Sequence, residues 1–218
     1  MNNYDAQVID EAVKAFAKHE TIYTIGLSCI DVLDFRDPDS FVYALRFVFD
    51  HQRGNRVYIS GDLGEAVVYP TCPATLEDMA YCFSSRKDDG SISVNWGYFL
   101  EKVRATSDRW CWTDERFWED FKEHCEEEGL DGLDFIENHK EFYWDGAVSV
   151  DTERGVTLSE FAKEELHDID PDFAGWVYDC GKRVSPRVIL WLVALRLACE
   201  AVEKERGAHV EQQADNCH

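Results

Sequence analysis

The segment FVYALRFVFDHQRGNRVYISGDLGEAVVYP, residues 41–70, decides the fold of the chain. Its apolar side chains recur at every second position, and this period of two is typical of β-strands. Turn residues interrupt the pattern at residues 51–55 (HQRGN) and again at residues 61–64 (GDLG), and Pro70 ends it. We therefore expect a short antiparallel meander of three strands, over residues 41–50, 56–60 and 65–69.

The segments on either side of the meander show helical spacing instead. Residues 5–18 predict an amphipathic helix, and residues 21–29 predict an extended segment. An acidic loop should follow, with Asp31, Asp34, Asp37 and Asp39. Beyond the meander, capping residues predict helices that begin after Thr75, Asn95, Thr113, Thr157 and Ser185, and a further helix is expected over residues 131–143.

The last of these helices has the clearest start, because Ser185 suits the cap and Pro186 suits the first helical position. It should run to about Arg206, where Gly207 ends it. Because its first turns are apolar nearly all round, we expect it to be the central helix of the core. Residues 208–218 are expected to be a flexible tail.

These patterns together predict an α+β protein, with the meander packed against about six to seven helices and a helix-rich C-terminal half. A chain of 218 residues with 45% hydrophobic content can bury one substantial core. We therefore expect a single domain over residues 1–218. Within it, residues 1–105 contain the strands, residues 106–207 form an acidic helical part, and residues 208–218 form the tail.

The net charge of −22 comes from 44 acidic and 22 basic side chains, and it is concentrated in the middle of the chain. Residues 106–180 alone carry 23 acids and 6 bases, a net charge of −17. Such a surface repels the phosphates of nucleic acids and of anionic membranes, and it attracts basic protein surfaces. We therefore expect no direct nucleic-acid or membrane partner. A solvated acidic face that serves solubility is the simpler interpretation.

Carboxylates at the spacing of helical turns stand out between residues 114 and 141. They could imitate a row of phosphates, as a DNA mimic does, and the aromatic faces of the same helices would keep them rigid. The candidate protein-interaction residues are Glu115, Glu119, Asp120, Glu123, Glu126, Glu127, Glu128, Asp131, Asp134 and Glu137.

No motif in the sequence predicts a catalytic residue, a cofactor site or a metal site. Phosphate-binding glycine motifs, G-x-S-x-G and C-x-x-C are all absent. Asp168-x-Asp170-x-Asp172 begins like a calcium loop, but Phe173 and Asp179 stand where such a loop needs Gly and Glu. This segment therefore predicts a polar loop between helices.

The eight cysteines are scattered, and no secretory signal precedes them. We therefore expect a cytoplasmic protein with reduced thiols, in which Cys29 and Cys199 fill small apolar sites of the core.

Part of the chain, residues 41–118, resembles a loose group of phage and prophage proteins of unknown function. The residues that carry the resemblance are Tyr58 to Gly64, with their G-D-x-G turn, Val67 to Tyr69, and the later Trp96, Tyr98 and Lys102. The resemblance implies that the gene comes from a mobile element. Small, acidic phage proteins include anti-CRISPR proteins, several of which block nucleic-acid channels with acidic surfaces.

These observations favour a phage-encoded, anti-CRISPR-type inhibitor. It would place its acidic face on the basic surface of a nucleic-acid-binding defence complex, such as a CRISPR effector in the host cytoplasm, and act as a monomer or homodimer. Two other functions stay open. One is a small metal-dependent enzyme, and the other is a module that self-associates through surplus aromatics, Trp110, Trp112, Trp118 and Trp144.

Overall fold

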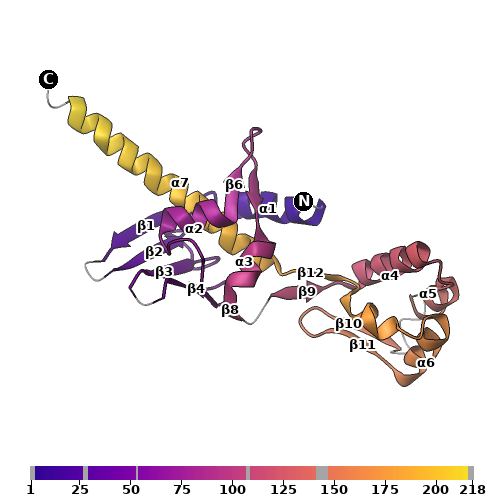
Figure 1. Ribbon diagram of the computed structural model, residues 1–218. Coiled ribbons are helices and arrows are strands. Elements are labelled where there is room, and N and C mark those ends of the chain that lie inside the picture. Colours follow the sequence, from indigo (N-terminus) through magenta and orange to yellow (C-terminus); the bar gives the residue numbers. More distant parts are fainter. Residues whose placement is uncertain (1–2, 27–28, 53, 107–108, 141–146, 216–218) are drawn as a thin grey trace. The chain divides into compact units, whose positions relative to one another are not determined.

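The computed structural model describes residues 3–26, 29–52, 54–106, 109–140 and 147–215. The chain divides into two compact units (Figure 1). Unit 1 comprises Met1–Arg109 and Pro186–His218, and unit 2 is the segment between them, Trp110–Ser185. Both units mix helices with antiparallel strands, so the α+β class is confirmed. The expectation that the whole chain forms one domain stays a prediction.

Unit 1 is built on an antiparallel sheet of six strands in the order β1-β2-β3-β4-β5-β8. The predicted meander forms its centre as β3 (Leu45–Asp50), β4 (Arg56–Gly61) and β5 (Ala66–Val68). The other strands are β1 (Glu20–Ile25), β2 (Ile30–Arg36) and β8 (Val103–Thr106). The register aligns Leu33, Phe47 and Ile59 across three strands, and their side chains are 0–3% exposed. One face of the sheet therefore forms the core.

Two details of this sheet differ from the sequence prediction. Residues 30–36, expected to begin an acidic loop, form β2, because Leu33 and Phe35 are buried while Asp34 binds Arg46 on the next strand at 2.7 Å. Residues 41–44, expected to open β3, form an exposed turn instead, and the side chain of Phe41 is 84% exposed. A period of two in apolar residues cannot distinguish a buried strand from an apolar turn next to one.

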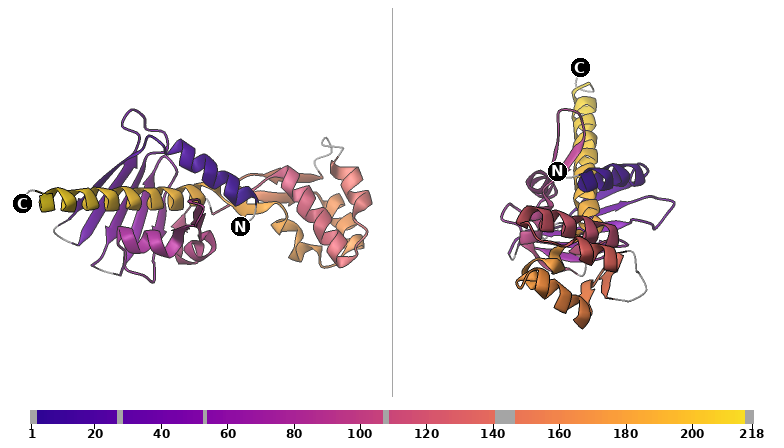
Figure 2. Two further views of the ribbon diagram at one scale, coloured as in Figure 1. Left: turned by 90° about the horizontal axis from the view of Figure 1, so that it is seen from above. Right: turned by 90° about the vertical axis from the view of Figure 1, so that its right-hand side faces the viewer.

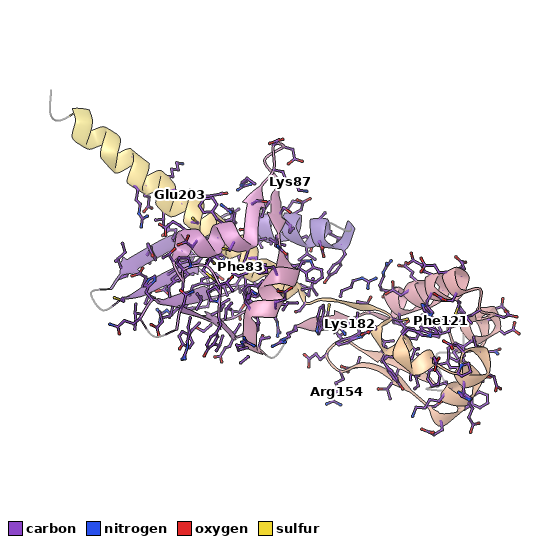
Figure 3. All side chains as sticks on the ribbon, viewed as in Figure 1. Phe83, Lys87, Phe121, Arg154, Lys182 and Glu203 are labelled. Carbon is purple, nitrogen blue, oxygen red and sulfur yellow. The ribbon has the colours of Figure 1, made fainter. Side chains whose placement is uncertain are left out.

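Helices of unit 1 cover the buried face of the sheet (Figure 2). They are α1 (Asn3–Ala15), α2 (Leu76–Phe83), α3 (Trp96–Lys102) and α7 (Pro186–Asp215). Between α2 and α3 lies a hairpin of β6 (Ser84–Arg86) and β7 (Ile92–Val94), with Lys87 at its tip (Figure 3). The predicted caps of α2 and α3 are confirmed, because the side chain of Thr75 accepts the Asp78 N–H and that of Asn95 accepts the Tyr98 N–H.

Helix α7 is the central helix of unit 1, as predicted. Val188, Ile189, Trp191 and Leu192 in its first turns are at most 1% exposed. Its end differs from the prediction, since α7 continues past Gly207 to Asp215 and Gly207 does not adopt a positive φ. A glycine that ends a helix usually adopts the left-handed conformation, and Gly207 does not. Residues 208–215, expected in a flexible tail, are therefore helical, and residues 216–218 lie outside the described residues.

Unit 2 begins and ends with paired strands, β9 (Trp110–Trp112) and β12 (Lys182–Val184). Between them, in chain order, come the helices α4 (Asp114–Glu128) and α5 (Leu133–Lys140) and then a hairpin of β10 (Val148–Asp151) and β11 (Gly155–Leu158). Helix α6 (Glu160–Ile169) and the 3-10 helices η1 (Phe173–Gly175) and η2 (Val177–Asp179) follow. The C-terminal half is thus rich in helices, as predicted, but its described part also holds short strands that the sequence did not indicate. Helix α6 is capped by Ser159, which accepts the Ala162 N–H, and not by Thr157, which lies in β11.

No helix in the described part of either unit is long and apolar enough to cross a membrane.

Candidate acidic interaction surface

Helix α4 of unit 2 separates aromatic and acidic side chains onto two faces. Phe117, Trp118, Phe121 and Cys125 are at most 4% exposed and form the buried face. Of the residues predicted for interaction, those that belong to α4 lie mostly at positions between the buried residues and face away from the core. The exposed carboxylates of α4 are Glu115, Glu119, Glu123, Glu126, Glu127 and Glu128.

Aromatic packing holds this helix in place. The rings of Phe121 and Phe135 stack with their centroids 5.1 Å apart, which joins α4 to α5, and Phe121 also contacts Trp176 at 5.3 Å. His124 stacks on Trp176 at 4.0 Å. Such ring pairs add to the stability that burial alone provides, so the carboxylates stand on a rigid support.

The turn from α4 to α5 depends on two glycines. Gly129 ends α4 with a φ of 70°, and the N–H of Leu130 donates to the Cys125 carbonyl at 2.8 Å. A Cβ atom at Gly132 would lie 2.5 Å from the sulfur of Cys125, so only glycine lets the chain pass that closely. This turn and α5 add three exposed carboxylates to the surface: Asp131, Asp134 and Glu137.

Asp120 differs from the other nine predicted residues because it is half-buried and tied to its neighbours. Its carboxylate accepts the Gly181 N–H at 2.9 Å and a guanidinium N–H of Arg183 at 2.8 Å, and Arg116 lies 3.0 Å away. Burial raises the pKa of Asp120, although Gly181 and Arg116 act in the opposite direction. Asp120 therefore fastens α4 to the start of β12, and we remove it from the set of residues available to a partner.

The exposed carboxylates of α4 have nearly the charge density of a nucleic-acid strand. Six of them lie between Glu115 and Glu128, which at 1.5 Å per residue is about one charge per 3 to 4 Å of helix axis. One strand of B-DNA carries about one charge per 3.4 Å. Two cations moderate this charge: Arg116 binds Glu119 at 2.6 Å, and Lys122 lies 3.6 Å from Glu126. We name the nine exposed carboxylates of α4, α5 and their turn the acidic face.

The other chemical candidates from the sequence do not assemble into a site. In the described part of the chain, no group of three or more His, Cys, Asp or Glu side chains could hold a metal ion. In the segment that begins like a calcium loop, Asp168 lies at the end of α6, and Asp170 and Asp172 lie in the short polar turn before η1. Asp170 accepts the indole N–H of Trp176 at 2.7 Å, and this bond holds the pKa of the Asp170 carboxyl below its ordinary value.

The aromatics proposed for self-association are only partly available. Trp118 is buried in the core of unit 2. Trp110 and Trp112 are half-buried, and the ammonium of Lys182 lies over both rings at 5.1 and 6.0 Å. Trp144 lies outside the described residues.

Of the two cysteines predicted to lie in the core, one is buried and the other is exposed. Cys199 is fully buried in α7, which confirms one prediction. Cys29 is exposed and has a positive φ of 62°, so the other prediction is wrong.

Sequence reasoning missed one polar cluster in unit 1. The carboxylate of Asp31 accepts the hydroxyl of Tyr23 at 2.9 Å and the Gly26 N–H at 3.1 Å, and it lies 3.0 Å from Nε2 of His51. Asp31 is only 8% exposed. Its partners stand 5 to 20 residues away in sequence, and no local pattern signals that they meet.

Comparison with protein-family models, with curated proteins and with solved structures finds no match for this chain.

Proposed function

We propose that this protein is a phage-encoded inhibitor of the anti-CRISPR type, which binds a basic, nucleic-acid-binding protein through the acidic face of unit 2. The carboxylates occupy the surface that the partner uses for phosphates, and nucleic acid is excluded. The observation that carries the proposal is the density of exposed carboxylates on one rigid helix, α4.

Charge distribution between the units supports this assignment. Unit 2 holds 22 acids and 7 bases, a net charge of −15, whereas the rest of the chain contributes −7 of the total of −22. A concentrated charge steers a basic partner to one part of the molecule and raises the rate of association at low salt.

Rigidity supports the assignment as well. Each long charged side chain that becomes fixed on binding costs free energy, so a prearranged support retains more of the electrostatic gain. The stacked rings of Phe121 and Phe135 and the bonds of Asp120 provide such a support.

The test begins with a pull-down. Tagged protein is incubated with extracts of cells that express defence complexes, washed at low or high salt, and the captured proteins are identified. The partner is then purified, and its affinity for this protein and for its own nucleic acid is measured. We expect competition between the two ligands, weaker binding at high salt, and no binding of DNA by this protein itself.

A matched pair of variants tests the role of the acidic face. The test variant replaces Glu119, Glu123, Glu126 and Glu127 with Gln. The control removes the same charge from exposed positions of unit 1: Asp10→Asn, Asp88→Asn, Glu101→Gln and Glu205→Gln. We expect the test variant to lose about ten- to a hundredfold in affinity, at about 0.5 kcal/mol or slightly more per lost charge, while the control changes little. Equal affinities of the two variants, both folded, would refute the electrostatic mechanism.

A further inference from the structure

The first strand of unit 1, β1, is an outer edge of the six-stranded sheet (Figure 1). It pairs with β2 over its whole length, from Glu20 opposite Arg36 to Ile25 opposite Asp31. About half of the backbone N–H and C=O groups of an edge strand face away from its only neighbour. In the described part of the chain, no backbone hydrogen bond from a turn or loop reaches these groups of β1.

The two edges of this sheet are protected to different degrees. The opposite edge, β8, has only four residues, its register with β5 shifts between Val67 and Val68, and it carries the exposed charge of Arg104. A short length, an irregular register and a charged side chain are devices by which proteins prevent further strand pairing. Strand β1 has six residues in regular register and contains no Lys, Arg or Pro.

The side chains of β1 also favour strand pairing. Its sequence, ETIYTI, consists of β-branched and aromatic residues after the initial Glu20. Ile22 is 49% exposed and Ile25 is 67% exposed. An edge strand that exposes such side chains is a template for another strand.

We propose that β1 pairs antiparallel with β1 of a second copy of this chain, so that the two sheets form one continuous sheet across a two-fold axis near Tyr23. Residues directly opposite in an antiparallel pair point to the same face. An axis at Tyr23 therefore places Ile22 opposite Thr24 of the second copy and Thr21 opposite Ile25 of the second copy. Both pairs join β-branched side chains.

The local charges of β1 permit pairing with a second copy of the strand. Glu20 is the only charged residue of β1. Antiparallel pairing sends the two copies of Glu20 to opposite ends of the interface, about 20 Å apart at 3.4 Å per residue. No like charges therefore oppose each other across the new strand pair.

The expected dimer is weak. A stable protein interface buries at least about 1,200 Å² of surface, and a single strand pair buries much less. We expect a monomer at low concentration and a dimer of twice 25.2 kDa at high concentration. Sedimentation velocity of the full chain over a wide concentration range measures this equilibrium. A monomer throughout would overturn the proposal and would leave β1 free for a strand of another protein.

A double variant with lysines on the edge tests the location. Ile22→Lys and Thr24→Lys place charges on exposed positions of β1, and they should weaken dimerisation by at least tenfold. The control, Phe41→Lys and Val42→Lys, adds the same charge at exposed apolar residues of the turn before β3 and should dimerise like the wild type. A dimer that survives the β1 lysines, or that is lost equally in the control, would contradict pairing through β1.

Hydrogen exchange provides a readout that does not depend on the variants. Amides in residues 20–25 of the wild type should exchange more slowly as its concentration rises, while the exposed turn at residues 41–44 should not respond. Exchange in residues 20–25 that is independent of concentration in a sample shown to be dimeric would place the interface elsewhere.

Discussion

Asp31 shows how a single buried carboxylate can link three elements of unit 1. Burial by itself would raise its pKa, but the hydrogen bonds from His51, Tyr23 and Gly26 outweigh this effect and hold the pKa below the ordinary value. Burial raises the pKa of the Tyr23 hydroxyl, and its hydrogen bond to Asp31 raises it further. The charged form of Asp31 therefore stabilises the fold.

We predict that Asp31→Asn lowers the free energy of unfolding at pH 7 by about 1–3 kcal/mol, the usual cost of disturbing hydrogen bonds to a buried charged group. Because the folded-state pKa is depressed, this stabilisation is present above the unfolded-state pKa of about 3.9 and is lost as the pH falls through the folded-state pKa. The difference between wild type and variant should thus be largest near neutral pH and shrink below about pH 4. Urea unfolding at several pH values measures it.

Asp10→Asn is the control for this prediction, because Asp10 is exposed on α1. Its unfolding free energy should differ little from that of the wild type. A difference for Asp31→Asn that stays constant down to acidic pH would mean that the charge of Asp31 contributes nothing, and that packing alone explains the loss.

Among the elements, several that depend on local signals were predicted correctly, whereas β2, which depends on distant contacts, was not. The meander and the caps at Thr75 and Asn95 depend on residues close in sequence, and they are confirmed. Strand β2 was missed because its acidic residues resemble a loop in the sequence. Their partners, Arg46 and His51, are distant in sequence and meet them only in the folded sheet.

The acidic face shows the same division. On α4, the sequence predicts Phe117, Trp118, Phe121 and Cys125 as the buried side and leaves most acids exposed, and the structure confirms this. On α5, the buried aromatic is Phe135, which the sequence pattern did not single out. The half-buried position of Asp120 depends on Gly181 and Arg183, more than 60 residues away, and no helical pattern contains that information.

Helix α7 permits a direct test of an element boundary. If Gly207 lies inside the helix, Gly207→Ala should raise the free energy of unfolding by about 0.5–1 kcal/mol, because alanine reduces the entropy of the unfolded chain and favours helix. A Cβ atom at this position meets nothing within 4 Å, so no clash offsets the gain. If Gly207 instead ended the helix in a left-handed conformation, alanine would destabilise the protein. Thermal and urea unfolding distinguish the two signs.

At the scale of the whole molecule, the charge and the candidate function lie in a segment inserted within unit 1. Trp110–Ser185 leaves unit 1 after Arg109 and returns at Pro186. Its ends lie together, because Trp110 in β9 is paired with Val184 in β12. It also contains its own apolar core around Phe117, Phe121 and Leu166. A segment with adjacent ends and its own core meets the usual conditions for folding independently.

We therefore predict that a fragment of residues 110–185 folds alone, with a cooperative thermal transition and a near-ultraviolet circular dichroism signal from its packed aromatics. Its size makes the stability modest, so Phe121→Ala, which removes a ring at the centre of the core, should abolish the transition at a cost of about 3–5 kcal/mol. The folded fragment should also retain the salt-sensitive binding of the full chain, because it carries the whole acidic face. A fragment that stays unfolded would instead support the prediction of a single domain over residues 1–218.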